Sequence, residues 1–120
     1  MSALFICYPG CSTCAKARSW LEEHQIAYTE RNIKAQNPTA AELEEWIAKS
    51  GLDSARFFNT SGMRYRELAL KDKLPAMSLQ ERISLLATDG MLVRRPLLIG
   101  DSFMLVGFKA PQWEETLTAP

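Results

Sequence analysis

Two cysteines in the motif Cys11-Ser12-Thr13-Cys14 are the residues of this sequence best suited to chemistry. They follow a Pro9-Gly10 turn and open a helical pattern, so both thiols are expected at a helix N-terminus. Unsatisfied backbone N–H groups and the positive end of the helix dipole favour thiolate over thiol there. Because the thiolate is the attacking species, we predict thiol–disulfide exchange with Cys11 as the nucleophile and Cys14, one turn deeper, as the resolving thiol.

Four other side chains near the motif are expected to assist the thiols or to be structural. Lys16 and Arg18 bring positive charge into the start of the helix and are expected to favour the Cys11 thiolate further. Cys7 belongs to an apolar strand and is expected to be buried without chemistry. His24 stands at the helix end, where it is expected to cap carbonyl groups or to face solvent.

Metal binding is the alternative use of the cysteines. Their Cys-x-x-x-Cys-x-x-Cys spacing matches that of radical-SAM iron–sulfur sites. Cys7 lies inside an apolar strand, however, and 120 residues are too few for the usual catalytic barrel. A closed zinc site needs a fourth ligand, and the sequence has no second cysteine pair. We therefore expect no metal and no bound cofactor.

Hydrophobic patterns predict the elements that must position these thiols. Strands are expected at 3–8, 26–33, 97–99 and 103–106, and helices at 12–24, 39–50, 54–70 (one or two pieces, broken near Gly62), 78–89 and 110–117. Thr39 with Glu42 and Ser78 with Glu81 form capping-box patterns. The first strand–helix–strand connection favours a parallel, right-handed crossover. We predict an α/β, thioredoxin-like fold with a mixed sheet, β-α-β then β-β-α, as a single domain over 1–120 with a helical insertion over 36–92.

Arg94-Arg95-Pro96 stands immediately before the short apolar strand 97–99. A proline there is consistent with an edge strand or with a cis peptide bond. In a thioredoxin fold a cis-proline loop faces the Cys-x-x-Cys motif and offers backbone groups to an extended substrate. We therefore predict Arg95 and Pro96 as substrate-binding residues, with Arg95 binding an oxyanion or stabilising the Cys11 thiolate. The alternative is a solvated basic pair.

The composition argues against several classes of protein. Lys and Arg total 14 and Asp and Glu total 14, so the net charge is zero, which argues against a dominant nucleic-acid surface. The N-terminus lacks the basic region of a signal peptide, and no run approaches the ~18 apolar residues of a membrane span. We expect a cytoplasmic monomer without membrane or direct nucleic-acid partners. In that reducing compartment Cys-x-x-Cys is usually catalytic or metal-binding.

Four segments carry a resemblance to a known family: YPGCSTCAKA (8–17), FFNTSG (57–62), DGMLVRRPL (89–97) and VGF (106–108). Together they resemble the arsenate reductase/Spx-type family, in particular its YffB-like and YusI-like members. The resemblance implies a thioredoxin-like fold with a helical insertion, Cys11 as the reactive cysteine and Arg95-Pro96 beside it.

The resemblance also separates the functions found in that family. Glutaredoxin-coupled arsenate reductases hold the oxyanion with the catalytic cysteine and three arginines. Arg95 matches one arginine, but the other two positions fall near Asn59 and Phe108. Losing two charge-assisted contacts of ~1.5–3 kcal/mol each should severely weaken arsenate binding. Those reductases also typically lack a second cysteine three residues on. Spx-type regulators have Cys-x-x-Cys, use it as a redox switch and bind the C-terminal domain of the RNA polymerase α subunit.

The leading hypothesis is therefore a thiol–disulfide oxidoreductase that acts through Cys11 and Cys14. Glutathione, a glutaredoxin or a thioredoxin is the expected reductant. The alternative is a Spx-like redox-switch regulator that binds the RNA polymerase α subunit, and arsenate reduction is the third hypothesis.

Overall fold

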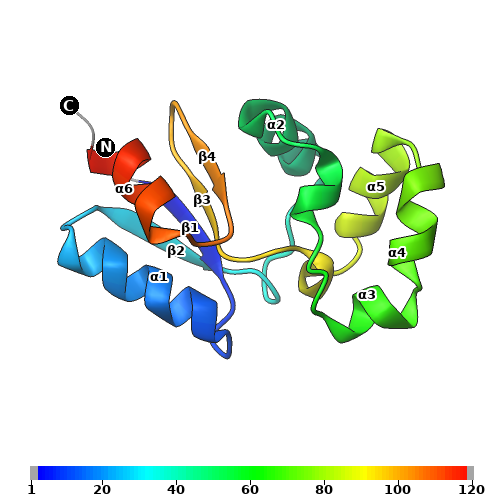
Figure 1. The fold of residues 1–120 in the computed structure, drawn as a ribbon, viewed down its shortest axis with the longest axis horizontal. Coiled ribbons are helices and arrows are strands. Elements are labelled where there is room, and N and C mark those ends of the chain that lie inside the picture. Colours follow the sequence, from blue (N-terminus) through cyan, green and yellow to red (C-terminus); the bar gives the residue numbers. More distant parts are fainter. Residues whose placement is uncertain (1–2, 119–120) are drawn as a thin grey trace. The chain divides into compact units, whose positions relative to one another are not determined.

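A computed structural model describes residues 3–118 of the protein, and the chain divides into two compact units. Unit 1 comprises the chain up to Asn32 and from Arg95 onward, and unit 2 comprises Ile33–Arg94. Figure 1 shows the strands with two helices in unit 1 and the other helices in unit 2. The expected insertion, 36–92, falls within unit 2. That the two units form a single domain stays a prediction.

Unit 1 contains the sheet. Its strands β1 (Ala3–Cys7), β2 (Tyr28–Asn32), β3 (Leu97–Ile99) and β4 (Met104–Val106) lie in the order β2-β1-β3-β4, with helices α1 (Ser12–Glu23) and α6 (Ala110–Thr118). β1 runs parallel to β2, as the α1 connection predicts, and antiparallel to β3, which pairs antiparallel with β4. This mixed sheet with its order of helices and strands is the thioredoxin-like α/β fold that the sequence predicts.

One face of the sheet packs against α1 and α6, which lie beside it in Figure 1. Every second residue of β1 points to this face, and apolar residues of α1 recur every three or four positions to meet it. The resulting buried cluster contains Ala3, Phe5, Cys7, Cys14, Ala17, Trp20, Leu21, Leu98, Leu105 and Trp113. Both Cys7 and Cys14 are thus held in the same core, on the same face of the sheet.

Unit 2 is helical. Its elements are α2 (Ala40–Ser50), η1 (Ser54–Phe57), α3 (Met63–Glu67), α4 (Leu70–Lys73), η2 (Leu74–Ala76), α5 (Leu79–Leu86) and η3 (Gly90–Leu92). Both predicted capping boxes are present, at Thr39 and at Ser78. The last predicted helix of the insertion is shorter than expected and ends at Leu86. The reason is that the Asp89 carboxylate accepts from the Met91 N–H at 2.9 Å and opens η3 instead.

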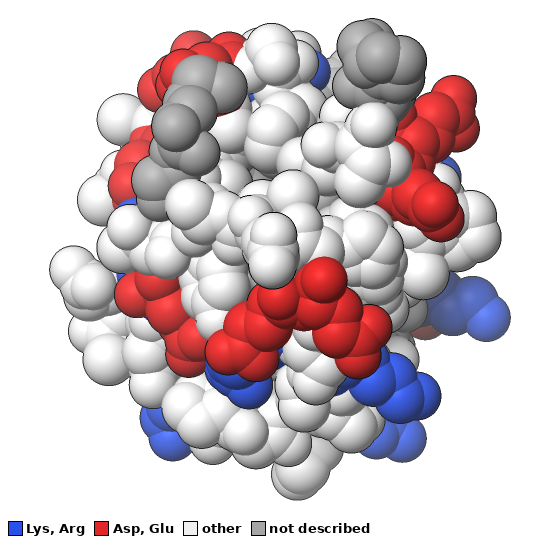
Figure 2. All heavy atoms as spheres, turned by 90° about the vertical axis from the view of Figure 1, so that its left-hand side faces the viewer, with Lys and Arg blue, Asp and Glu red and all other residues white. Residues whose placement is uncertain are grey.

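No helix in the described part of the chain is long and apolar enough to cross a membrane. Figure 2 shows one face of the molecule, on which acidic side chains lie across the middle and along both sides and basic ones lie mainly toward the lower edge. Charges of both signs therefore share this face, in keeping with the zero formal net charge.

The capping box at Ser78 gives a first testable prediction. Its Oγ accepts from the Glu81 N–H at 3.1 Å, and the Glu81 carboxylate accepts from the Ser78 N–H at 2.8 Å. We expect Ser78→Ala to lower the free energy of unfolding by about 1 kcal/mol in urea titrations, because an orphan N–H of α5 loses its partner. Ser84→Ala, on the exposed side of the same helix, is the control and should be neutral or slightly stabilising. Equal losses in the two variants would contradict the capping role.

Candidate active site

Cys11 is the N-cap of α1, and its sulfur caps the helix. Its backbone is extended (φ −91°, ψ 120°), and Sγ accepts a hydrogen bond from the Cys14 N–H at 3.4 Å. Its own N–H donates to the Tyr8 carbonyl at 3.0 Å, which closes the Pro9-Gly10 turn. The side chain is partly exposed. Cys11 Sγ therefore lies where the free N–H groups of the helix point.

Cys14 lies three residues further on and is fully buried. Its Sγ accepts a hydrogen bond from the Tyr8 N–H at 3.5 Å. Burial is the main reason that the pKa of Cys14 rises to about 12, and the hydrogen bond and charge of Cys11 add to it. At neutral pH Cys14 is therefore a buried, protonated thiol one helical turn from Cys11.

The pKa of Cys11 moves in the opposite direction. Burial works to raise it, but backbone N–H groups of Cys14 and Thr13 and the positive charge of Arg95 outweigh burial. The pKa of the Cys11 thiol is consequently below its ordinary value. A partly exposed thiol with a lowered pKa next to a buried, protonated thiol is the asymmetry that a nucleophile and a resolving thiol require.

Arg95 reaches Cys11 through the pairing of β1 with β3. Leu97 lies opposite Ile6 in the antiparallel register, so the residues before Leu97 lie beside the end of β1, where the Cys11 loop begins. The guanidinium carbon of Arg95 lies 5.5 Å from the centre of the Tyr8 ring, a cation–π contact. Tyr8 thus holds Arg95 at a place where its charge acts on Cys11.

The Arg95–Pro96 peptide bond is cis, one of the two arrangements that the sequence allows. The other, an edge strand, is wrong, because β3 lies between β1 and β4. A proline is compatible with this central strand because it precedes the first strand residue, Leu97. The Pro96 carbonyl accepts from the Gly107 N–H at 2.8 Å and so ties the loop to the end of β4.

Arg18 does not have the role that the sequence suggests. Its guanidinium forms a bidentate ion pair with Glu30 of β2, with Nε at 2.9 Å and Nη2 at 3.1 Å from the carboxylate oxygens. The same Nη2 donates to Cys7 Sγ at 3.3 Å. Because Arg18 is two turns into α1 and turns toward β2, Arg95 and not Arg18 is the arginine that lowers the pKa of Cys11.

Aromatic side chains follow β4. Gly107, with a left-handed φ of 75°, leads the chain toward α6, and Phe108 comes directly after it. The Phe108 ring meets Trp113 edge-on at 4.8 Å and Trp20 at 6.5 Å between ring centres. An apolar ring thus stands at one of the positions where an arsenate reductase is expected to carry an arginine. Asn59, near the other such position, belongs to unit 2.

Sequence reasoning missed two residues around the thiols, Tyr8 and Glu30. An aromatic residue directly before a Pro-Gly turn could have indicated Tyr8, but its contact with Arg95 depends on the register between β1 and β3. Glu30 could have been found from the parallel pairing, which sets it opposite Phe5. His24, by contrast, has the expected capping position, with Nδ1 at 2.9 Å from the Trp20 carbonyl oxygen.

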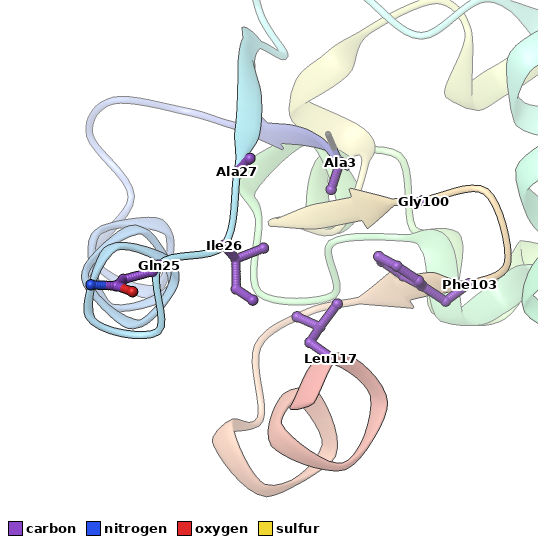
Figure 3. A pocket seen from close by; sticks show the side chains of 7 residues that line it. All are labelled: Ala3, Gln25, Ile26, Ala27, Gly100, Phe103 and Leu117. Carbon is purple, nitrogen blue, oxygen red and sulfur yellow. The ribbon is translucent and has the colours of Figure 1, made fainter. Parts of the chain in front are cut away.

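One hollow of unit 1 lies away from the thiols. It has a volume of about 340 Å³, and Figure 3 shows its mostly apolar lining. The lining residues are Ala3, Gln25, Ile26, Ala27, Gly100, Phe103 and Leu117. Since β1 runs from Ala3 to Cys7, this hollow is at the opposite end of the strand from the cysteines. Among residues 3–118 no cluster of His, Cys, Asp or Glu is arranged to hold a metal ion.

A Cys-x-x-Cys motif at the start of α1 and a cis-proline before β3 define a protein of the thioredoxin-like class. Within that class the chain belongs to the ArsC family, whose sequence model matches residues 7–116. The crystal structure of an ArsC family related protein from Bacteroides fragilis superimposes with a TM-score of 0.93 at 55% identity, covering 96% of this chain and 97% of that one.

Two curated relatives show the range of the family. The protein YusI of Bacillus subtilis is 53% identical over 115 residues, which cover 96% of this chain and 98% of YusI. The global transcriptional regulator Spx of Staphylococcus epidermidis is 34% identical over 101 residues, which cover 83% of this chain and 75% of Spx. The chain is therefore similar to YusI over nearly its whole length and, over a shorter stretch, to a transcriptional regulator.

The charge of Arg95 gives a second prediction. We expect Arg95→Met to raise the pKa of Cys11, because the guanidinium charge that favours the thiolate is gone. Tyr8→Leu should shift it in the same direction by releasing Arg95 from its cation–π contact. The thiolate absorbance near 240 nm, followed against pH in a Cys7→Ala/Cys14→Ala background, measures this pKa.

Arg94→Met is the matched control, because it removes an equal charge from the neighbouring residue. An unchanged titration in Arg95→Met, or equal shifts in the Arg94 and Arg95 variants, would contradict a specific role for Arg95.

Proposed function

We propose that this protein is a thiol–disulfide oxidoreductase. The observation that carries the proposal is the pair of opposed thiols at the start of α1. Cys11 Sγ accepts the Cys14 N–H at 3.4 Å and has a lowered pKa, whereas Cys14 is buried with a pKa raised to about 12. Membership of the ArsC family supports thiol chemistry in general, and the Cys-x-x-Cys motif supports the dithiol form of it.

The proposed reaction begins with the Cys11 thiolate. It attacks one sulfur of a substrate disulfide, forms a mixed disulfide and expels the other substrate sulfur as a thiolate, which takes up a proton. Cys14 then loses its proton, attacks Cys11 Sγ and expels the second substrate thiolate. The two electrons that reduce the substrate come from the dithiol, which becomes the Cys11–Cys14 disulfide.

The order of these steps follows from the coupling between the two thiols. The charge and hydrogen bond of Cys11 help to hold Cys14 protonated. When Cys11 enters a mixed disulfide, its negative charge disappears, and the pKa of Cys14 falls. Cys14 is thereby activated only after Cys11 has reacted, so the resolving step follows capture of the substrate.

The substrate and the reductant are proposed from the chemistry around Cys11. Arg95, which directly precedes the buried Pro96, offers one guanidinium beside Cys11, which suits a peptide-like disulfide or a glutathionylated thiol. Two glutathione thiols, a glutaredoxin or a thioredoxin would return the two electrons. The reducing cytoplasm supplies such reductants and is the proposed location.

Substitution of each cysteine tests the proposal. Cys11→Ser should abolish reduction of a glutathionylated peptide, lowering the rate at least about 100-fold, because the hydroxyl is not ionised at neutral pH. Cys14→Ser should instead accumulate the mixed disulfide, visible as an added substrate mass in intact-protein mass spectrometry. Circular dichroism spectra that match the wild type establish that both variants fold. Equal turnover in the wild type and Cys11→Ser would refute the proposed function.

A second candidate function is a redox-controlled regulator, favoured by the similarity to the global transcriptional regulator Spx. In this alternative the Cys11–Cys14 disulfide sets the affinity for the C-terminal domain of the RNA polymerase α subunit. A pull-down with that domain should then retain the oxidised protein and the reduced protein to different extents. The Cys11→Ser/Cys14→Ser variant, which cannot switch, is the control. No retention in either redox state would remove this candidate.

Arsenate reduction is supported less well. The ArsC family model matches most of the chain. Of the three arginines that hold the oxyanion in the arsenate reductases, however, this chain matches only the one at Arg95. The Phe108 ring packs against Trp113 and Trp20, and a phenyl ring has no donor for an oxyanion. Arg95 would then supply most of the charge-assisted hydrogen bonds to a doubly charged oxyanion. This favours dithiol exchange over oxyanion reduction as the function of the site.

A further inference from the structure

Cys7 is a third thiol next to the proposed dithiol. It is the last residue of β1 and is 0% exposed. Its Sγ accepts from Arg18 Nη2 at 3.3 Å, and Glu30, the ion-pair partner of Arg18, helps to raise the pKa of the thiol. The Arg18–Glu30 ion pair therefore lies beside Cys7 on the α1 side of the sheet, and its guanidinium contacts the sulfur.

Cys14 is the cysteine that lies next to Cys7. Its Sγ is 3.5 Å from the backbone nitrogen of Tyr8, the residue bonded directly to Cys7. Cys14 and Arg18 are four residues apart on α1 and so share one helix face, and Arg18 touches Cys7. The charges of Cys11 and of Cys7 both act on Cys14. Cys11 is therefore the partly exposed thiol of the three, and Cys14 and Cys7 are both buried.

Resting on the proposed function, we propose that Cys7 is a second resolving thiol that attacks Cys14 Sγ in the Cys11–Cys14 disulfide. The Cys7 thiol gives up its proton to water, the Cys7 thiolate forms a bond with Cys14 Sγ, and the Cys11–Cys14 bond breaks with release of the Cys11 thiolate. No electrons leave the protein, because one disulfide replaces another. The oxidising equivalents move into the core, and Cys11 becomes a nucleophile again.

The direction of this exchange follows from the leaving sulfur. In thiol–disulfide exchange the thiol of lower pKa leaves faster and is more stable when free. Cys11, with its helix N–H donors and Arg95, is the best leaving group of the three. A Cys7–Cys14 disulfide also leaves neither of the two buried sulfurs to ionise in the core, where burial raises their pKa values.

The exchange should be slow at neutral pH and faster in base. Burial and Glu30 raise the pKa of Cys7 to about 11, while Arg18 works in the other direction. The other titratable groups that act on or around Cys7 are Cys14 on α1 and Tyr28 on β2. Below pH 11 each unit of pH should raise the exchange rate about tenfold, because the thiolate fraction rises tenfold.

Differential labelling measures the exchange. The protein is oxidised with glutathione disulfide, freed of reagent, held at pH 7 or pH 9 for a series of times and quenched in acid. N-ethylmaleimide under denaturing conditions marks the remaining free thiol, and iodoacetamide after reduction marks the two that were bonded. All three cysteines lie on one tryptic peptide ending at Lys16, so tandem mass spectrometry reads the three positions together.

We expect the maleimide label to move from Cys7 to Cys11 with time, about 100-fold faster at pH 9 than at pH 7. A label that stays on Cys7 at both pH values, or appears on Cys14, would overturn the exchange while leaving the proposed function intact. Failure of any disulfide to form would contradict the proposed function, and this inference with it. The Cys7→Ala variant is the control and should form the Cys11–Cys14 disulfide with no thiol left to label.

A charge variant separates exchange from a structural role of Cys7. Glu30 raises the pKa of Cys7 through its hydrogen bond and charge, so Glu30→Gln should move the pH profile of label migration to lower pH. Glu23→Gln, which neutralises an exposed carboxylate of α1, is the matched control and should leave the profile unchanged. Coincident profiles for the wild type and Glu30→Gln would contradict the role of Glu30 in controlling Cys7.

Discussion

The hydrogen bond from the Cys14 N–H to Cys11 Sγ is the interaction on which the site depends. It fixes Cys11 as the N-cap of α1, so the sulfur meets the unpaired N–H groups that favour its thiolate. It also fixes Cys14 one turn inside the helix, on the face that packs into the core. This local contact therefore places Cys11 where its pKa is lowered and Cys14 where burial raises its pKa.

The pairing of the strands brings the charged residues Arg95 and Glu30 to the cysteines. Antiparallel pairing of β1 with β3 carries Arg95 and Pro96 to the end of β1, and the Tyr8 ring holds the guanidinium there. Parallel pairing of β1 with β2 brings Glu30 to Arg18 and both to Cys7. The charges around the three sulfurs thus come from segments far apart in the sequence and depend on strand register.

Local signals were readable from the sequence, and contacts between strands were not. Capping boxes at Thr39 and Ser78 follow from short-range hydrogen bonding, and both are present. The helix-start position of Cys11 follows from the Pro9-Gly10 turn. The partner of Arg18 could not be read from its position in α1, because it is set by where β2 lies. The pairing of Tyr8 with Arg95 needs a register that spans most of the chain, and no local pattern encodes it.

The most direct test of a dithiol centre at the start of α1 is a redox titration of the Cys7→Ala variant, which keeps only Cys11 and Cys14, in glutathione buffers, with the state of the two thiols read by mass. The opposed pKa values of these two thiols predict a reversible two-electron transition in which an intramolecular disulfide replaces both thiols. A protein that stays reduced throughout the titration, with a Cys11 that ionises like an ordinary thiol at about pH 8.5, would contradict the dithiol assignment.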